Sequence, residues 1–385
     1  MTSLDALRKT FHDILGGSSR IFRAPGRVNL IGGHLDYNEG WVLPIAIDRS
    51  CFIAAKPRND RRLRIHSVQM QETFECDLDE ARPAQHHWSN YVRGVAWALR
   101  ETGQSIGGAD LLILNEVPMG AGLSSSAALE VSAAYGLLRL SGLEMDRVQL
   151  ARVCQRAEDE YVGMRCGIMD QLAACCGLRG HALLIDCRTL EIESVPFDES
   201  SVAVVVANTM VRHALAASSE YNRRRQECDD AVARIRAMRP NVKTLRDVSW
   251  VEIERIASTW PDNIRRRARH VTSEMLRVHA AAAALRKNDF VKLGRLISDA
   301  HASLDKDYEV SSSELNLMVD LAKKIPGILG ARMTGAGFGG CTMNLVRASA
   351  ATEFAGKLAK CYEDRTGIRA DVYVCRASDG VEEIA

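Results

Sequence analysis

A glycine- and serine-rich segment at residues 118–127 holds the groups that most directly suggest chemistry. It reads Pro-Met-Gly-Ala-Gly-Leu-Ser-Ser-Ser-Ala and lies between an apolar run at residues 110–115 and a helical pattern at residues 127–140. Backbone amides at the start of a helix, together with the helix dipole, attract anions. The segment therefore predicts a phosphate-binding loop, and a simple helix-capping turn is the alternative interpretation.

This segment fits neither of two common nucleotide-binding patterns. It lacks the Gly-Lys-Ser/Thr ending of a Walker A loop and the Gly-x-Gly-x-x-Gly spacing of a dinucleotide-binding fold. A second glycine-rich segment, at residues 334–341, lies between apolar strands near the C-terminus. Its glycine density indicates either a backbone that closely approaches another group or a tight hairpin.

The elements that must position these loops form an α+β pattern with the longest helices in the second half. We expect a helix within residues 1–20 and short strands and turns over residues 21–76. Further helices are expected at residues 91–100, 127–140, 147–178, 220–236, 264–287 and 289–302. Further strands are expected at residues 110–115, 181–186, 202–207, 329–346 and 370–375. We place a domain boundary near residue 200, which gives domains at 1–200 and 201–385.

Bulk composition excludes several classes of function. The 50 Lys and Arg residues balance 49 Asp and Glu residues, so no net charge attracts nucleic acid or an anionic membrane. The eleven cysteines are scattered, with no Cys-x-x-Cys pair, which favours a reducing compartment over a disulfide framework or a cysteine metal site. No apolar run approaches the roughly 20 residues that span a bilayer, and the charged N-terminal segment excludes a secretory signal. We expect a soluble cytoplasmic protein.

Residues 23–40 form a motif that is too specific to be explained by composition. They read Arg-Ala-Pro-Gly-Arg-Val-Asn-Leu-Ile-Gly-Gly-His-Leu-Asp-Tyr-Asn-Glu-Gly, which closely resembles the galactokinase signature. Residues 120–127 and 333–341 then resemble the second and third motifs of the wider family of galactokinase, homoserine, mevalonate and phosphomevalonate kinases (GHMP kinases). Residues 91–94, 166–171, 217–221 and 307–310 extend the resemblance over nearly the whole chain.

The resemblance implies a two-domain α+β fold and an ATP-dependent sugar 1-kinase. The N-terminal half would resemble ribosomal protein S5 domain 2, and the C-terminal half would be ferredoxin-like, with ATP and sugar between them. The small-molecule partners would be ATP and a galactose-like sugar. The balanced charge and the lack of an apolar span predict no nucleic-acid or membrane partner, and the oligomeric state stays open, with a monomer favoured.

By resemblance, Asp170 faces the anomeric hydroxyl, whose acidity lets a carboxylate serve as base. Arg27 would lie beside both Asp170 and the transferred phosphoryl group and stabilise the transition state, with a structural ion pair as the alternative. The same resemblance assigns ATP binding to Gly120, Ala121, Gly122, Leu123, Ser124, Ser125, Ser126 and Ala127. Ser126 and Glu158 would bind Mg²⁺ through hard oxygen ligands.

The resemblance also assigns ring-hydroxyl contacts to Asp36 and the Gly167 backbone, with Tyr221 lining the sugar pocket. His34 would lie beside the sugar, or serve as a buried histidine bonded to the backbone. The chain departs from the family pattern at Gly33, where galactokinases normally carry a Glu that contacts the sugar O6 hydroxyl. Gly33 would remove a charged acceptor and open space at the C6 end of the pocket.

Three sugars stay possible given Gly33. Galactose is the conservative choice, L-arabinose lacks the hydroxymethyl group, and galacturonate carries a carboxylate there that a Glu would repel. We predict a weaker preference for galactose over L-arabinose than in a Glu-bearing relative, and a gain in galactose preference for Gly33→Glu. Two other classes are less favoured: a non-catalytic sugar sensor, because Arg27, Glu158 and Asp170 are all present, and a kinase for another acceptor, because residues 34–38 match the sugar signature.

Overall fold

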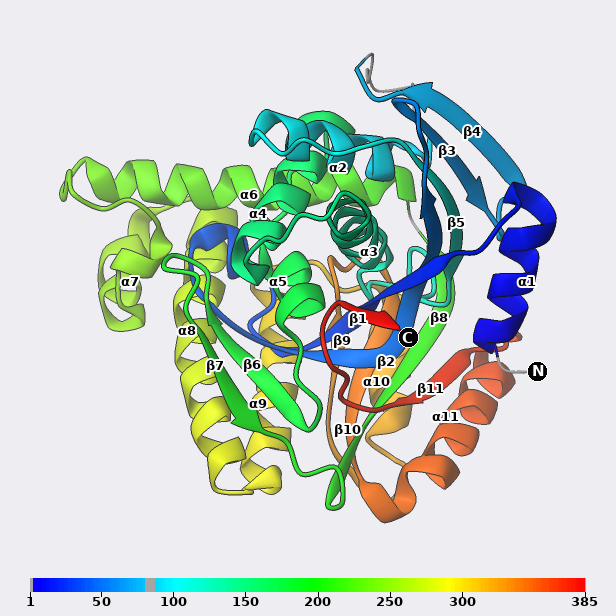
Figure 1. Cartoon of the computed structure of the whole chain (residues 1–385). Helices are drawn as coiled ribbons and strands as arrows, with labels where there is room; N and C mark the ends of the chain where they lie inside the picture. The colour runs from blue at the N-terminus through cyan, green and yellow to red at the C-terminus, as the bar shows by residue number, and fades with distance from the viewer. Residues whose placement is uncertain (1–2, 80–86, 213, 385) are drawn as a thin grey trace.

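The computed structural model describes residues 3–79, 87–212 and 214–384, and these residues form two β-sheets covered by helices (Figure 1). The described strands are β1 (Arg20–Ile31), β2 (Trp41–Pro57), β3 (Arg62–Ser67), β4 (Glu72–Asp77), β5 (Ala109–Asn115), β6 (His181–Asp186), β7 (Ile192–Pro196), β8 (Val202–Arg212), β9 (Ile328–Thr334), β10 (Gly339–Arg347), β11 (Asp371–Cys375) and β12 (Glu382–Ile384). The described α-helices are α1 (Ser3–Leu15), α2 (Asn90–Glu101), α3 (Ser125–Leu140), α4 (Arg147–Arg156), α5 (Met169–Cys176), α6 (Ala214–Arg236), α7 (Trp250–Ile256), α8 (Asp262–Arg286), α9 (Phe290–Lys306), α10 (Ser313–Ala322) and α11 (Ala351–Thr366).

The larger sheet carries the first half of the chain. Its main strand order is β12-β1-β2-β5-β3-β4. Strand β6 joins this sheet by pairing with β2, and β7 pairs with β6. Side chains alternate between its two faces. Leu112 packs beneath α1, whereas Leu111 and Ile113 belong to the core shared with helices on the opposite face. Figure 1 shows α1 on one side of β5 and helices α2 to α5 on the other.

The smaller sheet carries the second half. Its order is β11-β8-β10-β9, and all of its neighbouring strands are antiparallel. One face packs against α10 and α11 through Val205, Phe354 and Leu358, while α9 lies along β9. The C-terminal strand β12 returns to the larger sheet and pairs with β1.

Most of the expected elements are present, and one was wrong. A continuous helix was expected over residues 147–178, but α4 continues only through a π-helical turn at Ala157–Val162. Gly163 then adopts a left-handed backbone conformation with φ 86°, which ends the helix. The non-helical stretch that follows leads to α5 and places Gly167 and Asp170 in the site described below.

No helix in the described part of the chain is long and apolar enough to cross a membrane. All eleven cysteines are free.

Candidate active site

Arg27 and Asp170 form a paired hydrogen bond between β1 and the first turn of α5. Arg27 Nε and Nη2 donate to the two carboxylate oxygens of Asp170 over 2.7 and 2.8 Å. The remaining nitrogen, Nη1, donates to the carbonyl oxygen of Gly122 over 2.6 Å. Such a fork of parallel hydrogen bonds fixes the orientation of a carboxylate. Buried Arg27 therefore joins Asp170 to the predicted phosphate loop.

Ser124 adds a second link between that loop and Asp170. It immediately precedes α3, where a serine usually caps the helix through its side-chain oxygen. Here the hydroxyl makes no capping bond and instead donates to Asp170 Oδ2 over 2.5 Å. The Ser124 backbone is left-handed, with φ 61° and ψ 48°, a costly conformation for a residue other than glycine. Strain of this kind is concentrated at functional sites.

The two glycine-rich segments lie in direct backbone contact. A Cβ atom on Gly335 would come within 2.7 Å of Gly122 Cα, and one on Gly122 would come within 2.9 Å of the Thr334 carbonyl oxygen. Both glycines have positive φ values, 76° at Gly122 and 83° at Gly335. The second segment is also the turn of the β9–β10 hairpin, so both interpretations of its glycines hold. The second segment therefore packs directly against the first loop.

Glu158 and Ser126, the predicted metal ligands, are neighbours in the structure. Glu158 lies buried in the π-helical turn and accepts hydrogen bonds from the Ser126 hydroxyl and, over 2.7 Å, from Gln171 Nε2. Burial raises the pKa of Glu158 to about 7, and the charge of Asp170 acts in the same direction. A π-helical turn often marks a functional position.

The oxygen ligands of Glu158 and Ser126 fit Mg²⁺, which usually combines one or two carboxylates with substrate phosphates and water. Within the described residues, no group of three or more His, Cys, Asp or Glu side chains is arranged to hold a metal. Ser126 and Glu158 are therefore the described residues whose oxygen atoms could contribute to such a site.

Glu130 extends this acidic cluster, although no role was predicted for it. It lies fully buried on α3 and accepts a hydrogen bond from Gln171 Nε2 over 3.2 Å. Burial raises its pKa well above the ordinary value, and the charge of Glu158 adds to this effect. Gln171 thereby bridges Glu130 and Glu158. The sequence signal that could have found it is a lone acidic residue among the mostly small and apolar residues of this helix.

Asp36 and Gly167, the predicted ring-hydroxyl contacts, are packed together. Asp36 begins a short 3-10 turn, Asp36–Asn38, and a Cβ atom on Gly167 would overlap its carboxylate. Only glycine therefore fits at position 167. Burial and, to a smaller extent, the charge of Asp170 raise the pKa of Asp36 to about 6.

His34 lies among tyrosines that come from both halves of the chain. Its Nδ1 shares a hydrogen bond of 3.0 Å with the Tyr37 hydroxyl, which in turn lies 2.7 Å from the Tyr308 hydroxyl. The rings of Tyr308 and Tyr221 are 4.8 and 5.8 Å from the His34 ring. Burial lowers the pKa of His34 to about 3, so the imidazole is neutral at physiological pH. Tyr37 and Tyr308 belonged to the recognised motifs but carried no predicted role.

The structure corrects the expected open space at Gly33. A Cβ atom there would come within 2.6 Å of Arg332 Nη2 and 3.3 Å of a Leu304 methyl group. The backbone of Gly33 is also held in place, because its carbonyl oxygen lies 3.1 Å from His270 Nε2. The guanidinium of Arg332 therefore occupies the position where a residue 33 side chain would begin.

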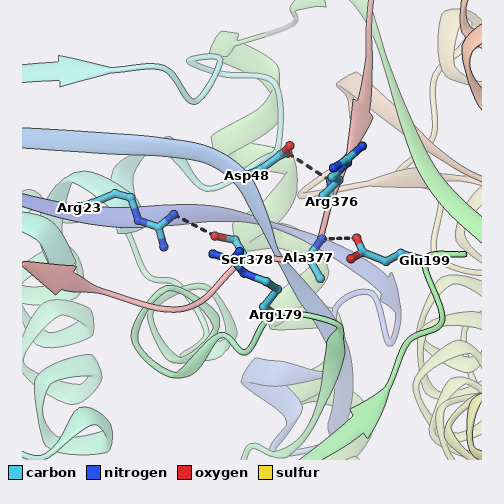
Figure 2. A pocket seen from close by; sticks show the side chains of 7 residues that line it. All are labelled: Arg23, Asp48, Arg179, Glu199, Arg376, Ala377 and Ser378. Carbon is cyan, nitrogen blue, oxygen red and sulfur yellow. Dashed lines mark hydrogen bonds between the residues drawn. The ribbon is translucent and has the colours of Figure 1, made fainter. Parts of the chain in front are cut away.

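Two cavities lie away from these residues. The one in Figure 2 has a volume of about 260 Å³ and is lined by Arg23, Asp48, Arg179, Glu199, Arg376, Ala377 and Ser378. The other, of about 400 Å³, borders Cys175, Cys176 and Arg147. In the first cavity Arg23 donates to Ser378, and the carboxylates of Asp48 and Glu199 accept backbone N–H groups from Arg376 and Ala377 (Figure 2). These contacts describe a structural junction between the C-terminal segment and the larger sheet.

Comparison with known proteins identifies matching families over much of the chain. The description "GHMP kinases N terminal domain" matches residues 90–178, and "GHMP kinases C terminal" matches residues 281–364. A third description, "Galactokinase galactose-binding signature", matches residues 9–57.

Individual relatives match along nearly the whole length. The galactokinase of Roseiflexus sp. (strain RS-1) is 47% identical over 385 residues, which is 100% of this chain and 98% of that protein. The galactokinase of Chloroflexus aggregans (strain MD-66 / DSM 9485) is 47% identical, covering 94% of this chain and 93% of the relative.

Solved structures agree with these relatives. The crystal structure of Lactococcus lactis galactokinase complexed with galactose is 36% identical, with a TM-score of 0.95 and complete coverage of both chains. A crystal structure of mevalonate kinase has a TM-score of 0.66 at 17% identity, covering 93% of this chain and 99% of that one. The similarity to mevalonate kinase shows a shared fold alone.

Proposed function

Because this chain belongs to the galactokinase family of the GHMP kinases, we propose that it transfers the γ-phosphoryl group of ATP to the anomeric hydroxyl of galactose, with Asp170 and Arg27 as its catalytic residues. The reaction is a phosphotransfer to an alcohol group. The observation that carries the proposal is the double hydrogen bond between Arg27 and Asp170, tied by Arg27 Nη1 to the Gly122 carbonyl oxygen. It holds a carboxylate and a cation beside a loop suited to phosphate.

Asp170 accepts the proton of the anomeric hydroxyl as that oxygen attacks phosphorus. The carboxylate is held by the Arg27 fork on one side and the Ser124 hydroxyl on the other, so little reorganisation precedes proton transfer. Arg27 supplies a permanent positive charge to the transferring phosphoryl group. The products are ADP and galactose 1-phosphate.

The ATP phosphates bind to the backbone amides of residues 120–127. The N-terminus of α3 provides a favourable dipole, and the contact between Gly122 and Gly335 supports the loop from behind. Ser125 is turned toward β5, where its hydroxyl accepts a hydrogen bond from Asn115 Nδ2 over 2.9 Å. The loop therefore presents backbone rather than hydroxyl groups at that position.

Ser126 and Glu158 would hold Mg²⁺. A bound Mg²⁺ would neutralise charge on the ATP phosphates. The raised pKa of Glu158 supports this assignment, because no cationic side chain in the described part of the chain pairs with this buried carboxylate, and a cation stabilises such a group. Gln171 keeps that carboxylate oriented through its 2.7 Å hydrogen bond.

Galactose binds between Asp36, the Gly167 backbone and Tyr221, with His34 at one end. Asp36 is an acceptor for ring hydroxyls, and the close packing of Gly167 leaves no side chain in the way. Neutral His34 offers one acceptor and one donor nitrogen. The relatives favour galactose over the L-arabinose and galacturonate alternatives.

The test of this function is ADP release with Mg-ATP in the presence of galactose, L-arabinose or galacturonate, with each product identified. The proposal expects galactose to have the highest specificity constant and to yield the 1-phosphate. A protein that binds galactose and ATP without releasing ADP would instead be a sugar sensor.

We further propose a cytoplasmic, monomeric protein with domains at 1–200 and 201–385. The eleven free cysteines support a reducing compartment. The change of sheet at β8, which begins at Val202, supports the boundary, while β12 crosses back to the first sheet. Gel filtration and limited proteolysis test the last two statements.

A further inference from the structure

Arg332 is a charged side chain that the proposed chemistry does not use. It lies on β9 and is fully buried. Its Nη2 atom packs on Gly33, within 2.6 Å of the point where a Cβ atom would stand. Gly33 immediately precedes His34 and lies three residues before Asp36, both of which we assign to the sugar. The guanidinium of Arg332 thus borders the proposed sugar site.

Two of the three nitrogens of the Arg332 guanidinium are engaged by the protein. Nε donates to the Met333 carbonyl oxygen over 2.8 Å, and Nη1 donates to the Leu30 carbonyl oxygen over 3.4 Å. Nη2 is shielded from solvent and has no hydrogen-bond partner within the described residues. An unpaired buried donor on a charged group is costly, so a partner for Nη2 is expected.

Glu274 does not supply that partner. One of its oxygens accepts from the Gly32 N–H over 2.9 Å, and the other accepts from Arg277 Nε over 2.6 Å. Glu274 forms an ion pair with Arg332 through Nη1, which lies 3.7 Å from Glu274 Oε1. The single negative charge of Glu274 is thus shared between Arg277 and Arg332, and Glu274 makes no hydrogen bond to Arg332 Nη2.

A second unsatisfied atom lies close by. His34 Nε2 is buried and has no hydrogen-bond partner in the part of the chain that the structure describes. The charge of Arg332 contributes to the lowered pKa of His34, which places the two groups in one electrostatic environment. Two buried polar atoms, Arg332 Nη2 against Gly33 and Nε2 of the neighbouring residue His34, are thus unpaired within the described residues.

We propose that Arg332 Nη2 donates a hydrogen bond to the O6 hydroxyl of galactose and so determines specificity at C6. This inference rests on the proposed function, because residue 33 is the position whose side chain is expected to meet O6. The donor reaches the site because Gly33 has no side chain. Arg332 would thereby replace a carboxylate acceptor at residue 33 with a cationic donor from the second half of the chain.

The test compares galactose with 6-deoxygalactose, which differs only by the O6 oxygen, and with L-arabinose, which lacks the C6 group. A hydrogen bond to a charged group predicts that the wild-type chain prefers galactose over 6-deoxygalactose in kcat/KM by about 10- to 100-fold. Arg332→Met should reduce that ratio to about threefold or less, while kcat/KM for 6-deoxygalactose and L-arabinose stays near the wild-type value. Arg277→Met is the matched control, because it removes a partner of Glu274 and should keep the wild-type ratio.

Gly33→Ala provides an independent variant that keeps the arginine. Its methyl group would displace Nη2, so it too should lower the galactose to 6-deoxygalactose ratio. An unchanged ratio in active Arg332→Met, or equal losses for all three sugars, would overturn the inference. If Arg332→Met does not fold, an unchanged ratio in Gly33→Ala overturns it. Failure of the wild-type chain to phosphorylate or bind galactose, followed by ADP release and thermal shift, would instead refute the proposed function.

Discussion

Ser124 donates its hydroxyl to Asp170, 46 residues further along the chain, rather than to the helix that it precedes. The bond is 2.5 Å long and is made from a left-handed backbone conformation. Ser124 could bond either to the start of the helix or to the carboxylate, and it bonds to the carboxylate. This arrangement connects the phosphate loop to the group that we assign as the base.

Ser124→Ala should lower kcat by about 10- to 100-fold, the value of one hydrogen bond to a charged group. The reason is that Asp170 keeps both hydrogen bonds from Arg27 and loses only the one from the Ser124 hydroxyl. Ser125→Ala is the matched control, because Ser125 contacts Asn115 instead. Steady-state kinetics with saturating sugar and ATP measure the difference. Equal effects of the two substitutions would show that the bond to Asp170 has no special role.

Arg27→Lys should lower kcat by about 10²- to 10³-fold. A lysine retains the charge but cannot make the two parallel bonds to Asp170 together with the bond to Gly122. Single-turnover kinetics separate this chemical step from substrate binding. A variant with wild-type kcat would mean that Arg27 is only a structural ion pair.

Gly335→Ala should lower kcat/KM for ATP by about 10- to 100-fold, because its methyl group would push on Gly122 and displace the phosphate loop. Gly142→Ala is the control: it has a similar positive φ of 69°, and a Cβ there meets no described atom within 4 Å. Both substitutions carry a backbone cost of about 1–2 kcal/mol. If both leave ATP kinetics unchanged, the loop contact is not important for nucleotide binding.

Glu158→Gln tests the buried carboxylate through the pH dependence of folding. Because the pKa of Glu158 is about 7 in the folded chain rather than 4.5, folding favours its neutral form. That contribution is complete below pH 4.5 and is lost as the pH rises through 7. The wild-type free energy of unfolding should therefore fall relative to the variant by up to about 3 kcal/mol between pH 5 and pH 8. Urea titrations without Mg²⁺ or ATP measure it, and a pH-independent difference would contradict the prediction.

The regular elements of the fold could be predicted because their patterns are local. The strand at residues 110–115 and the helix at 127–140 correspond to β5 and α3 within two residues. We predicted one continuous helix over residues 147–178, and this was wrong. Most residues in that range favour a helix, and this concealed the break that occurs at Gly163 and Gly167. Helices α7, α10 and α11 were not predicted.

The site residues could be predicted only where they lie in recognised motifs. Arg27 and Asp170 lie in recognised segments, and the structure brings them within hydrogen-bonding distance. Glu130 and Arg332 could not be found in this way, because their roles depend on partners far away in sequence, Gln171 and Gly33. The same limit explains the wrong expectation at Gly33: the space left by its missing side chain is filled from β9.

Asp170→Asn tests directly whether Asp170 acts at the anomeric hydroxyl. The measurement is the rate of ADP release with galactose and Mg-ATP, with the sugar product identified by ³¹P NMR and folding checked by circular dichroism. We predict that the wild-type chain forms galactose 1-phosphate and that the folded variant is about 10²- to 10⁴-fold slower. A folded Asp170→Asn protein with the wild-type rate, or a wild-type product phosphorylated at another hydroxyl, would contradict the account.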